Sequence, residues 1–504
     1  MNSKSMKSVM QVALVLIVLV WSYLYGIGAG MHHVVPGGIQ RNAMFISVAV
    51  SNLKYGLSGY MGYNRIFFAL VNGGMTTDKE KLLKYGFTRY EDALTNKDFM
   101  QGVLDSVLKM EYPNLSGQYN MLSHDFGMVD YYRVAFKIFG FKIESFYYLY
   151  FLIFTVLIIA YIVCFYGRPG PMNLLLVVLC AHLAAMKVLP QVGIELMTVH
   201  NVRCIPLLLF IPTLHIALLV RGGRRAEPLT AATAVAQACV IIFVCHIRST
   251  GVISIMAIMS LFAIWVIRQF IINPSAGMYV FRMVRVWPIV LVLCGMFILK
   301  FFLAAALHHS YDDDVTGHSM WDPMYAGLQY HPDISKSVSK TGCHYTMTCG
   351  DASVRKKREQ EAAFSQYKVH EFILKGEVFK IIKEDPGYAV VNYLNKMVII
   401  FKRLFSASYG LIGGMSNPWM LVIIAAGAIV TIPATSRRFL RDVQLMTVIF
   451  LLWLGIGILF LPDDVSSSET AFALAAIIYL SFSALIGKFA EIFYYKNFNR
   501  SPCV

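Results

Sequence analysis

Two aspartates could supply the general base of a transfer reaction. Asp125 and Asp130 stand five residues apart in HDFGMVD (124–130). A general base that deprotonates a hydroxyl is most often a carboxylate or a histidine held near the acceptor. We expect both to be candidate catalytic residues, with Asp125 the better placed. Glu91 and Asp92 form a second acidic pair, in a more ordinary surface context. The alternative role of each acid is an exposed cap or turn.

Basic residues flank the outer ends of several apolar segments. Arg203, His246 and Arg248 hold such positions. An ionisable group at the end of an apolar, membrane-spanning segment is costly and tends to face a cavity or a partner. Two guanidinium groups could bind phosphate oxygens in a forked geometry, so we assign these three residues to a phosphate site. Interfacial snorkelling, or a salt bridge to Glu195, is the alternative.

A third cluster is chemically the most diverse. It contains His318, Trp321, Asp322 and Tyr325. The aromatic rings could stack on a sugar, and the histidine and aspartate could orient the sugar or bind a metal. An ordered surface loop is the alternative. No zinc or EF-hand spacing occurs, although a divalent cation could bind the acidic run 312–314.

Several classes of chemistry lack their motifs. The sequence contains no P-loop, GxSxG, HExxH or usable GxGxxG motif. ATP-driven transport and Rossmann chemistry are therefore not expected. Cys343 and Cys349, six residues apart, favour a short disulfide in an oxidising compartment. A metal site, with His344 as a further ligand, is the alternative.

Composition indicates the elements that must position these residues. Apolar residues make up 57% of the 504 and charged residues only 14%, well below a soluble protein. A spanning helix needs about 20 mostly apolar residues. We therefore predict an all-α polytopic membrane protein with about ten spans, near 9–29, 146–166, 171–190, 203–220, 229–246, 250–271, 286–307, 416–436, 443–461 and 470–490.

The distribution of charge predicts the topology. Lysine and arginine are enriched in cytoplasmic loops, and this pattern puts both termini in the cytoplasm. The segments 31–145 and 308–395 then lie outside the inner or plasma membrane, and they hold 22 of the 29 acidic residues. The net charge of +15 therefore reflects topology and attraction to anionic lipid. Nucleic acid is not an expected partner.

The chain divides into alternating membrane and outer parts. The expected parts are a first anchor at 1–30, an outer segment at 31–145, spans two to seven at 146–307, a second outer segment at 308–405, and the last three spans with the tail at 406–504.

The outer segments contain helix-like stretches. Residues 43–55 and 62–72 are apolar and could lie on the membrane, and 96–110 has the spacing of an amphipathic helix. Residues 122–145 are expected to end as a helix running into the second span. Residues 364–405 suggest two interfacial helices joined by a turn at Pro386 and Gly387, the second of which could equally be an eleventh membrane element.

The layout resembles the GT-C superfamily of integral-membrane glycosyltransferases. The stretch VAFKIFGFKIESFYYLYFLIFTVLIIAYIV (134–163) is similar to the passage from outer loop to second span in bacterial members. The stretch FKIIKEDPGYAVVNYLNKMVIIFKRLF (379–405) is similar to their helix, Pro-Gly turn and helix. Many members carry an acidic residue soon after the first span, whereas this chain has none before Asp78. Asp125, or Glu91 with Asp92, would then have taken that role, or the fold is kept without the activity.

The resemblance implies a sugar transfer at the outer face of the membrane. The donor would be a polyprenyl phosphate carrying one sugar, with its phosphate near Arg203 or Arg248. A carboxylate would deprotonate the acceptor hydroxyl. A non-catalytic subunit of a larger membrane assembly is the first alternative, and a transporter is the second, although a transporter would put its polar groups at mid-membrane.

Overall fold

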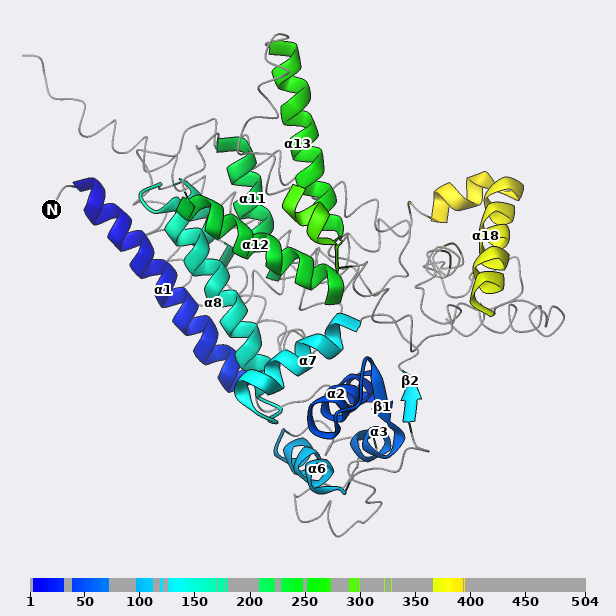
Figure 1. Ribbon diagram of the computed structural model, residues 1–504. Helices are drawn as coiled ribbons and strands as arrows, with labels where there is room; N and C mark the ends of the chain where they lie inside the picture. Colours follow the sequence, from blue (N-terminus) through cyan, green and yellow to red (C-terminus); the bar gives the residue numbers. More distant parts are fainter. Residues whose placement is uncertain are drawn as a thin grey trace, which may run out of the picture.

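The described part of the chain is mostly helical, which confirms the all-α class (Figure 1). The computed structural model describes residues 3–30, 39–71, 97–111, 118–120, 126–168, 170–176, 178–179, 208–222, 228–247, 252–272, 290–296, 298–299, 321, 328, 366–392 and 394. Its elements are α1 (Ser3–Gly30), α2 (Ile39–Tyr55), β1 (Met61–Tyr63), α3 (Asn64–Val71), α6 (Lys97–Lys109), β2 (Gln118–Asn120), α7 (Phe126–Phe139), α8 (Ser145–Phe165), α11 (Phe210–Gly222), α12 (Pro228–Ile247), α13 (Val252–Ile272) and α18 (Gln366–Glu384).

Two of the described helices, α8 and α12, are long and apolar enough to cross a membrane. They coincide with the expected spans 146–166 and 229–246. An apolar stretch within α1, Ser8–Leu24, is shorter. Length and composition therefore support membrane association for this part of the chain.

The remaining expected spans are described in part or not at all. The span at 9–29 falls within α1, the span at 250–271 matches α13, and the span at 203–220 is helical in α11. The spans at 171–190 and 286–307 are helical at 170–176, 178–179, 290–296 and 298–299. The spans at 416–436, 443–461 and 470–490 lie outside the described residues, so a total of ten stays a prediction.

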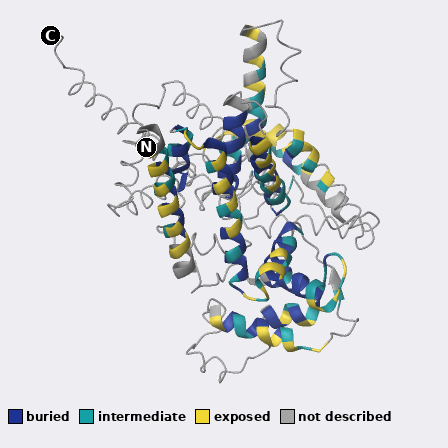
Figure 2. Cartoon of the chain, turned by 60° about the vertical axis from the view of Figure 1, so that its left-hand side comes forward, coloured by how far each residue is buried: buried dark blue, intermediate teal, exposed yellow. Residues whose placement is uncertain are grey.

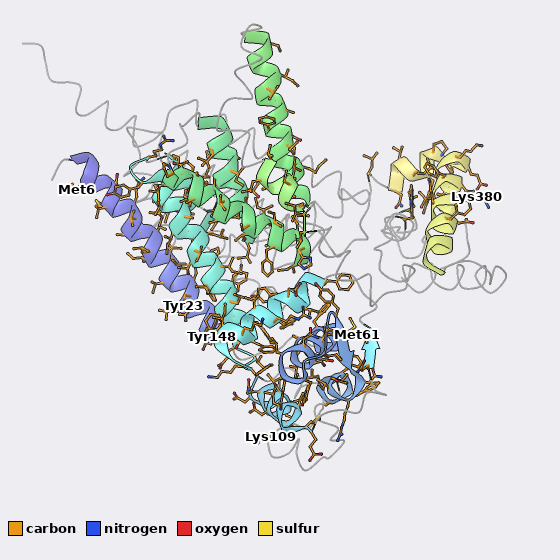
Figure 3. All side chains as sticks on the ribbon, in the orientation of Figure 1. Met6, Tyr23, Met61, Lys109, Tyr148 and Lys380 are labelled. Atoms are coloured by element: carbon orange, nitrogen blue, oxygen red, sulfur yellow. The ribbon has the colours of Figure 1, made fainter. Side chains whose placement is uncertain are left out.

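Helix α8 packs against α1, α11 and α12. Tyr23 of α1, labelled in Figure 3, meets Phe151 of α8 edge-on, with ring centroids 5.1 Å apart. Deeper in the bundle, the buried Gln237 of α12 donates from Nε2 to the Leu157 carbonyl of α8 at 2.9 Å. The same nitrogen lies 3.1 Å from Nδ1 of His215 on α11. One buried polar contact thus joins three helices.

Helices α2, α3, α6 and α7 form a second packed unit, shown below α8 in Figure 1. Helix α2 packs on α3, β1 and α7, and β1 pairs antiparallel with β2, with Met61 opposite Asn120. Helix α6 confirms the amphipathic helix expected at 96–110, and the apolar side chains that it buries are Phe99, Met100, Val103, Leu104 and Val107.

Helix α2 confirms the helical character of 43–55, and α3 confirms that of 62–72 from Asn64 on, since 62 and 63 belong to β1. The apolar faces of both helices are turned inward. Phe45 and Val48 of α2 and Ile66 and Leu70 of α3 are fully buried. These side chains pack in the core of the unit because the helices contact each other. The sequence suggested that both stretches could lie on the membrane. In the structure these apolar side chains pack inside the protein instead.

The expectation that 122–145 ends as a helix running into the second span was wrong. Helix α7 ends at Phe139 and α8 begins at Ser145. Gly140 adopts φ +83°, a conformation that L side chains rarely take, and its N–H donates to the Phe136 carbonyl at 2.9 Å. Ser145 Oγ donates back to the Gly140 carbonyl at 2.7 Å. The chain therefore turns a corner between α7 and α8.

Helix α18 stands apart from these helices in Figure 1. It ends at Glu384, and residues 386–392 are helical again. Asp385 caps the second helix, since its Oδ1 accepts from the Tyr388 N–H at 2.9 Å. Pro386 then takes the first helical position, where a missing N–H costs nothing. The two helices are thus separated at Asp385, whereas Pro386 and Gly387, where the turn was expected, belong to the second helix.

Candidate functional site

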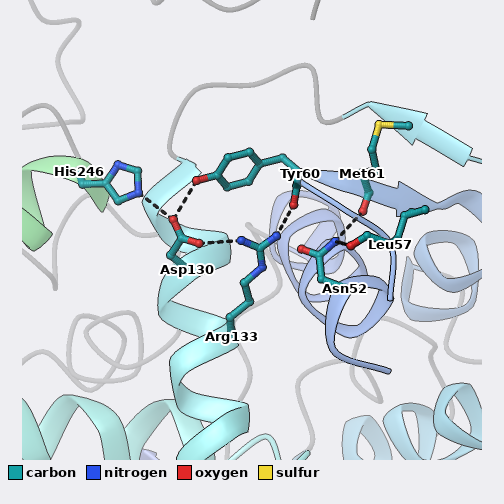
Figure 4. Close-up of polar contacts among 8 residues, drawn as sticks. Asn52, Leu57, Tyr60, Met61, Asp130, Arg133 and His246 are labelled. Atoms are coloured by element: carbon teal, nitrogen blue, oxygen red, sulfur yellow. Dashed lines mark hydrogen bonds and ion pairs between the residues drawn. The ribbon is translucent and has the colours of Figure 1, made fainter. Parts of the chain in front are cut away.

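The candidate site is centred on Asp130, in the second turn of α7. Three side chains contact its carboxylate (Figure 4). His246 Nε2 and the Tyr60 hydroxyl lie 2.9 Å from Oδ2, and Arg133 Nη1 lies 2.8 Å from Oδ1. The Asp130 side chain is 28% exposed. Asp130 is therefore a partly buried carboxylate with a partner on each oxygen.

His246 comes from a different part of the chain. It lies in the last turn of α12 and is separated from Asp130 by 116 residues. Its side chain is only 6% exposed. The contact therefore joins α7 to the end of α12, an apolar helix that is long enough to span a membrane. A carboxylate can orient an imidazole, and an imidazole can accept or give a proton near neutral pH.

The turn before β1 and the next turn of α7 hold the other two partners. Arg133 also donates from Nη2 to the Gly59 carbonyl, and its guanidinium lies 5.2 Å from the Tyr60 ring centroid. Asn52 of α2 donates from Nδ2 to the Leu57 carbonyl at 2.6 Å and to the Met61 carbonyl at 3.3 Å (Figure 4). These bonds fix the turn that carries Tyr60.

The electrostatics favour an ionised Asp130. Burial raises the pKa of its carboxyl. The hydrogen bond to His246, the charge of Arg133 and the hydrogen bond from Tyr60 lower that pKa by more than burial raises it. The pKa of Asp130 consequently lies below its ordinary value, and the group is a carboxylate at neutral pH.

A glycine permits the close approach of the two helices. A Cβ on Gly127 would lie 2.5 Å from the carbonyl carbon of His246 and from the nitrogen of Ile247. Real Cβ atoms essentially never make such contacts. The second residue of α7 thus rests directly on the backbone that carries His246, and Asp130 follows one turn later on the same helix face.

The structure unites two residues that the sequence assigned to separate roles. Asp130 was predicted to be catalytic and His246 to bind phosphate. Asp125, immediately before α7, lies outside the described residues, as do Arg203 and Arg248. The roles of these five residues stay predictions.

The predicted acceptor cluster is described only at Trp321. Its ring lies 5.5 Å from the Phe379 ring, and Lys375 Nζ lies 5.8 Å from its centroid, so Trp321 sits on α18. His318, Asp322 and Tyr325 lie outside the described residues. Their sugar-binding role stays a prediction.

The described residues do not test the disulfide or a metal site at the predicted positions. Cys343 and Cys349 lie outside them, whereas Cys164, Cys239, Cys245 and Cys294 are described and are free thiols. No group of three or more metal-ligating side chains gathers within the described ranges. The divalent cation considered for 312–314 also falls outside those ranges.

Sequence reasoning missed Tyr60, Arg133 and Gly127. Arg133 follows Asp130 by three residues on a helix, a spacing that does predict an ion pair. Tyr60 gives no such local signal because it reaches Asp130 across 70 residues. Gly127 stands at the start of a helix, where its role depends on a neighbour 119 or more residues away in the sequence.

Comparison of the chain with family models, curated proteins and solved structures finds no match. The geometry of the site and the charge pattern of the sequence therefore carry the functional argument.

Proposed function

We propose that the chain is a GT-C-like membrane glycosyltransferase that moves a sugar from a polyprenyl-phosphate donor to an extracytoplasmic acceptor. In this proposal the chain has about ten spans and both termini in the cytoplasm. The segments 31–145 and 308–395 face outward. Its partners are membrane lipid and the lipid-linked sugar.

The contact between Asp130 and His246 carries this proposal. The charge pattern puts the first outer segment and the end of the span 229–246 on the same side of the membrane, although that pattern contains no information about their contact. The 2.9 Å approach of the two side chains is consistent with that topology. An acid–base pair at the end of an apolar helix could meet a donor that arrives from the lipid.

The surface of α8 supports a lipid environment. About half of its most apolar stretch is not buried, and Figure 2 shows buried and exposed residues alternating along the helices. Leu152, Val156, Ile159 and Val163 are exposed at helical spacing. A helix that is hydrophobic all round belongs in a large core or a membrane, and this helix is exposed on one side.

The proposed reaction is a single displacement. The acceptor hydroxyl loses its proton at the Asp130–His246 site and attacks the anomeric carbon, and the lipid phosphate leaves. Arg203 and Arg248 are the proposed phosphate ligands. Positioning of the two substrates and stabilisation of the phosphate would supply most of the rate.

The test is transfer by membranes containing the full chain. Synthetic polyprenyl phosphates, each carrying one kind of sugar, are added as donors, and the membranes supply the acceptor. Released polyprenyl phosphate is measured, so the acceptor need not be known. We expect release from at least one donor and about 10²-fold or greater loss in His246→Gln. Absence of release from every donor would reject the enzyme.

A specific observation favours a second candidate, a non-catalytic subunit of a membrane assembly. Both oxygens of Asp130 are engaged by neighbouring side chains, as in a structural ion pair. Such a subunit would copurify with partners in fixed stoichiometry. Substitution of His246 would change stability and leave the work of the assembly unchanged.

A further inference from the structure

We infer that His246, through Nδ1, is the general base of the transfer, and that Asp130 is the positioning residue that fixes its tautomer. This inference rests on the proposed glycosyltransferase function. It assigns the proton-accepting atom, which the function alone leaves open between Asp125, Asp130 and the imidazole.

The engaged carboxylate argues against Asp130 itself as the base. Oδ1 accepts from Arg133 Nη1 at 2.8 Å. Oδ2 accepts from the Tyr60 hydroxyl and contacts His246 Nε2, both at 2.9 Å. A proton delivered to either oxygen would displace one of these donors and leave Arg133 partly buried without its anion. The carboxylate is therefore arranged to remain ionised, in agreement with its lowered pKa.

The same contact determines which nitrogen of His246 carries the proton. An ionised carboxylate accepts hydrogen bonds and has none to donate, so His246 Nε2 must be the donor. In the neutral ring Nδ1 then carries a lone pair. Within the described part of the chain, the bond to Asp130 is the side-chain hydrogen bond of His246. Nδ1 thus keeps a lone pair that can take a proton.

The proton and electron pairs balance in one step. The acceptor O–H bond breaks and its proton moves to Nδ1. The acceptor oxygen bonds to the anomeric carbon, and the bond from that carbon to the phosphate oxygen breaks with its electron pair left on phosphate. The resulting imidazolium is stabilised by the Asp130 carboxylate.

Few titratable groups face His246 from the described elements. Asp130 contacts it from α7, with Arg133 and Tyr60 behind that carboxylate. No ion pair or hydrogen bond reaches its ring from the described residues of α8 or α11. Arg248, two residues along the chain, lies outside the described residues.

Carbethoxylation tests the free nitrogen without any need for turnover. Diethyl pyrocarbonate reacts with an unprotonated imidazole nitrogen, and peptide mass spectrometry of the treated, folded full-length chain measures the rate at His246. We expect the rate to fall in acid, and this acid limb to move to lower pH in Asp130→Asn, because the imidazolium loses its counter-charge. Asp130→Glu keeps the charge and should keep the limb near its wild-type position.

His215 is the internal control for this measurement. It is fully buried between α8, α11 and α12, so it should stay unmodified as long as the bundle is folded. Modification of His215 in Asp130→Asn would identify unfolding, and the loss of release in His246→Gln would then carry the test. An unreactive His246, or an acid limb that does not move in folded Asp130→Asn, would overturn the inference.

The transfer assay distinguishes failure of the inference from failure of the function. We expect His246→Gln to lose about 10²-fold or more of the release rate and Asp130→Asn to retain measurable release with its acid limb at lower pH. Val134→Ala, on the exposed side of α7, is the matched control and should match wild type. If wild type releases polyprenyl phosphate, His246→Gln stays active and Asp125→Asn is inactive, the inference about His246 is overturned. The proposed function then stands. No release by wild type overturns both.

Discussion

At the scale of the residue, Asp130 is an anion stabilised by three neighbours from two other segments and its own helix. Tyr60, Arg133 and His246 all contact its carboxylate. Since these contacts lower its pKa, folding and ionisation of this group are linked. The direction of the pKa shift predicts how the stability of the folded protein changes in acid.

A carboxyl whose pKa is lower in the folded state favours folding only while it is ionised. Its contribution should be fully present above the ordinary pKa of 3.8 and should be lost as the pH falls through the lower folded value. We expect wild type to unfold at a higher temperature than Asp130→Asn at neutral pH, and the gap to narrow below about pH 4. Thermal unfolding in detergent at several pH values measures it. A gap that stays constant in acid would contradict the assignment.

The sequence predicts part of this site. Asp130 and His246 are identifiable because each is an ionisable residue beside an apolar segment. Their contact is not predictable because it spans 116 residues and depends on how α7 and α12 pack. The contact of Tyr60 is not predictable for the same reason, since only the folded turn before β1 brings its hydroxyl to Asp130.

At the scale of the element, the approach of α7 to α12 depends on Gly127. A Cβ there would meet backbone atoms of His246 and Ile247, which cannot rotate away as a side chain can. We expect Gly127→Ala to destabilise the protein by about 1–3 kcal/mol through overpacking. It should also weaken the contact between Asp130 and His246, so the acid limb of carbethoxylation at His246 should shift as it does in Asp130→Asn.

Gly376 is the matched control for that substitution. It lies within α18, and a Cβ at this position would meet nothing within 4 Å. Gly376→Ala should therefore raise stability by about 0.4–1 kcal/mol. Thermal unfolding of both variants measures the difference. Equal effects of the two substitutions would contradict the close packing of α7 on α12.

Helices were more predictable than their junctions. Local apolar spacing identified α6, and apolar length identified α8 and α12. The pattern across 134–163 continues through Gly140, so the sequence suggested one helix where the structure has two. That corner depends on Gly140, which adopts a positive φ. The spacing of apolar residues does not predict such a backbone conformation.

At the scale of the whole molecule, the proposal requires the outward face of α8 to meet lipid. Val156 lies near the middle of that helix and is 45% exposed. A lysine at the centre of a spanning helix costs about 2.5–3.5 kcal/mol. We therefore expect Val156→Lys to reduce the fraction of the chain recovered in alkali-washed membranes.

The control uses the same change outside the proposed membrane. Ile138 of α7 is 54% exposed, and a lysine at such a surface position should change stability by no more than about 0.5 kcal/mol. Ile138→Lys should therefore be recovered like wild type. If both variants behave like wild type, α8 does not face lipid and the span 146–166 is rejected.

Native mass spectrometry of the full-length protein, extracted gently from its own membrane, tests the central claim most directly. We expect a bound polyprenyl phosphate, or the same lipid carrying a sugar. Stable partner subunits in fixed stoichiometry, with no such lipid bound, would contradict the glycosyltransferase and favour a structural member of a membrane assembly.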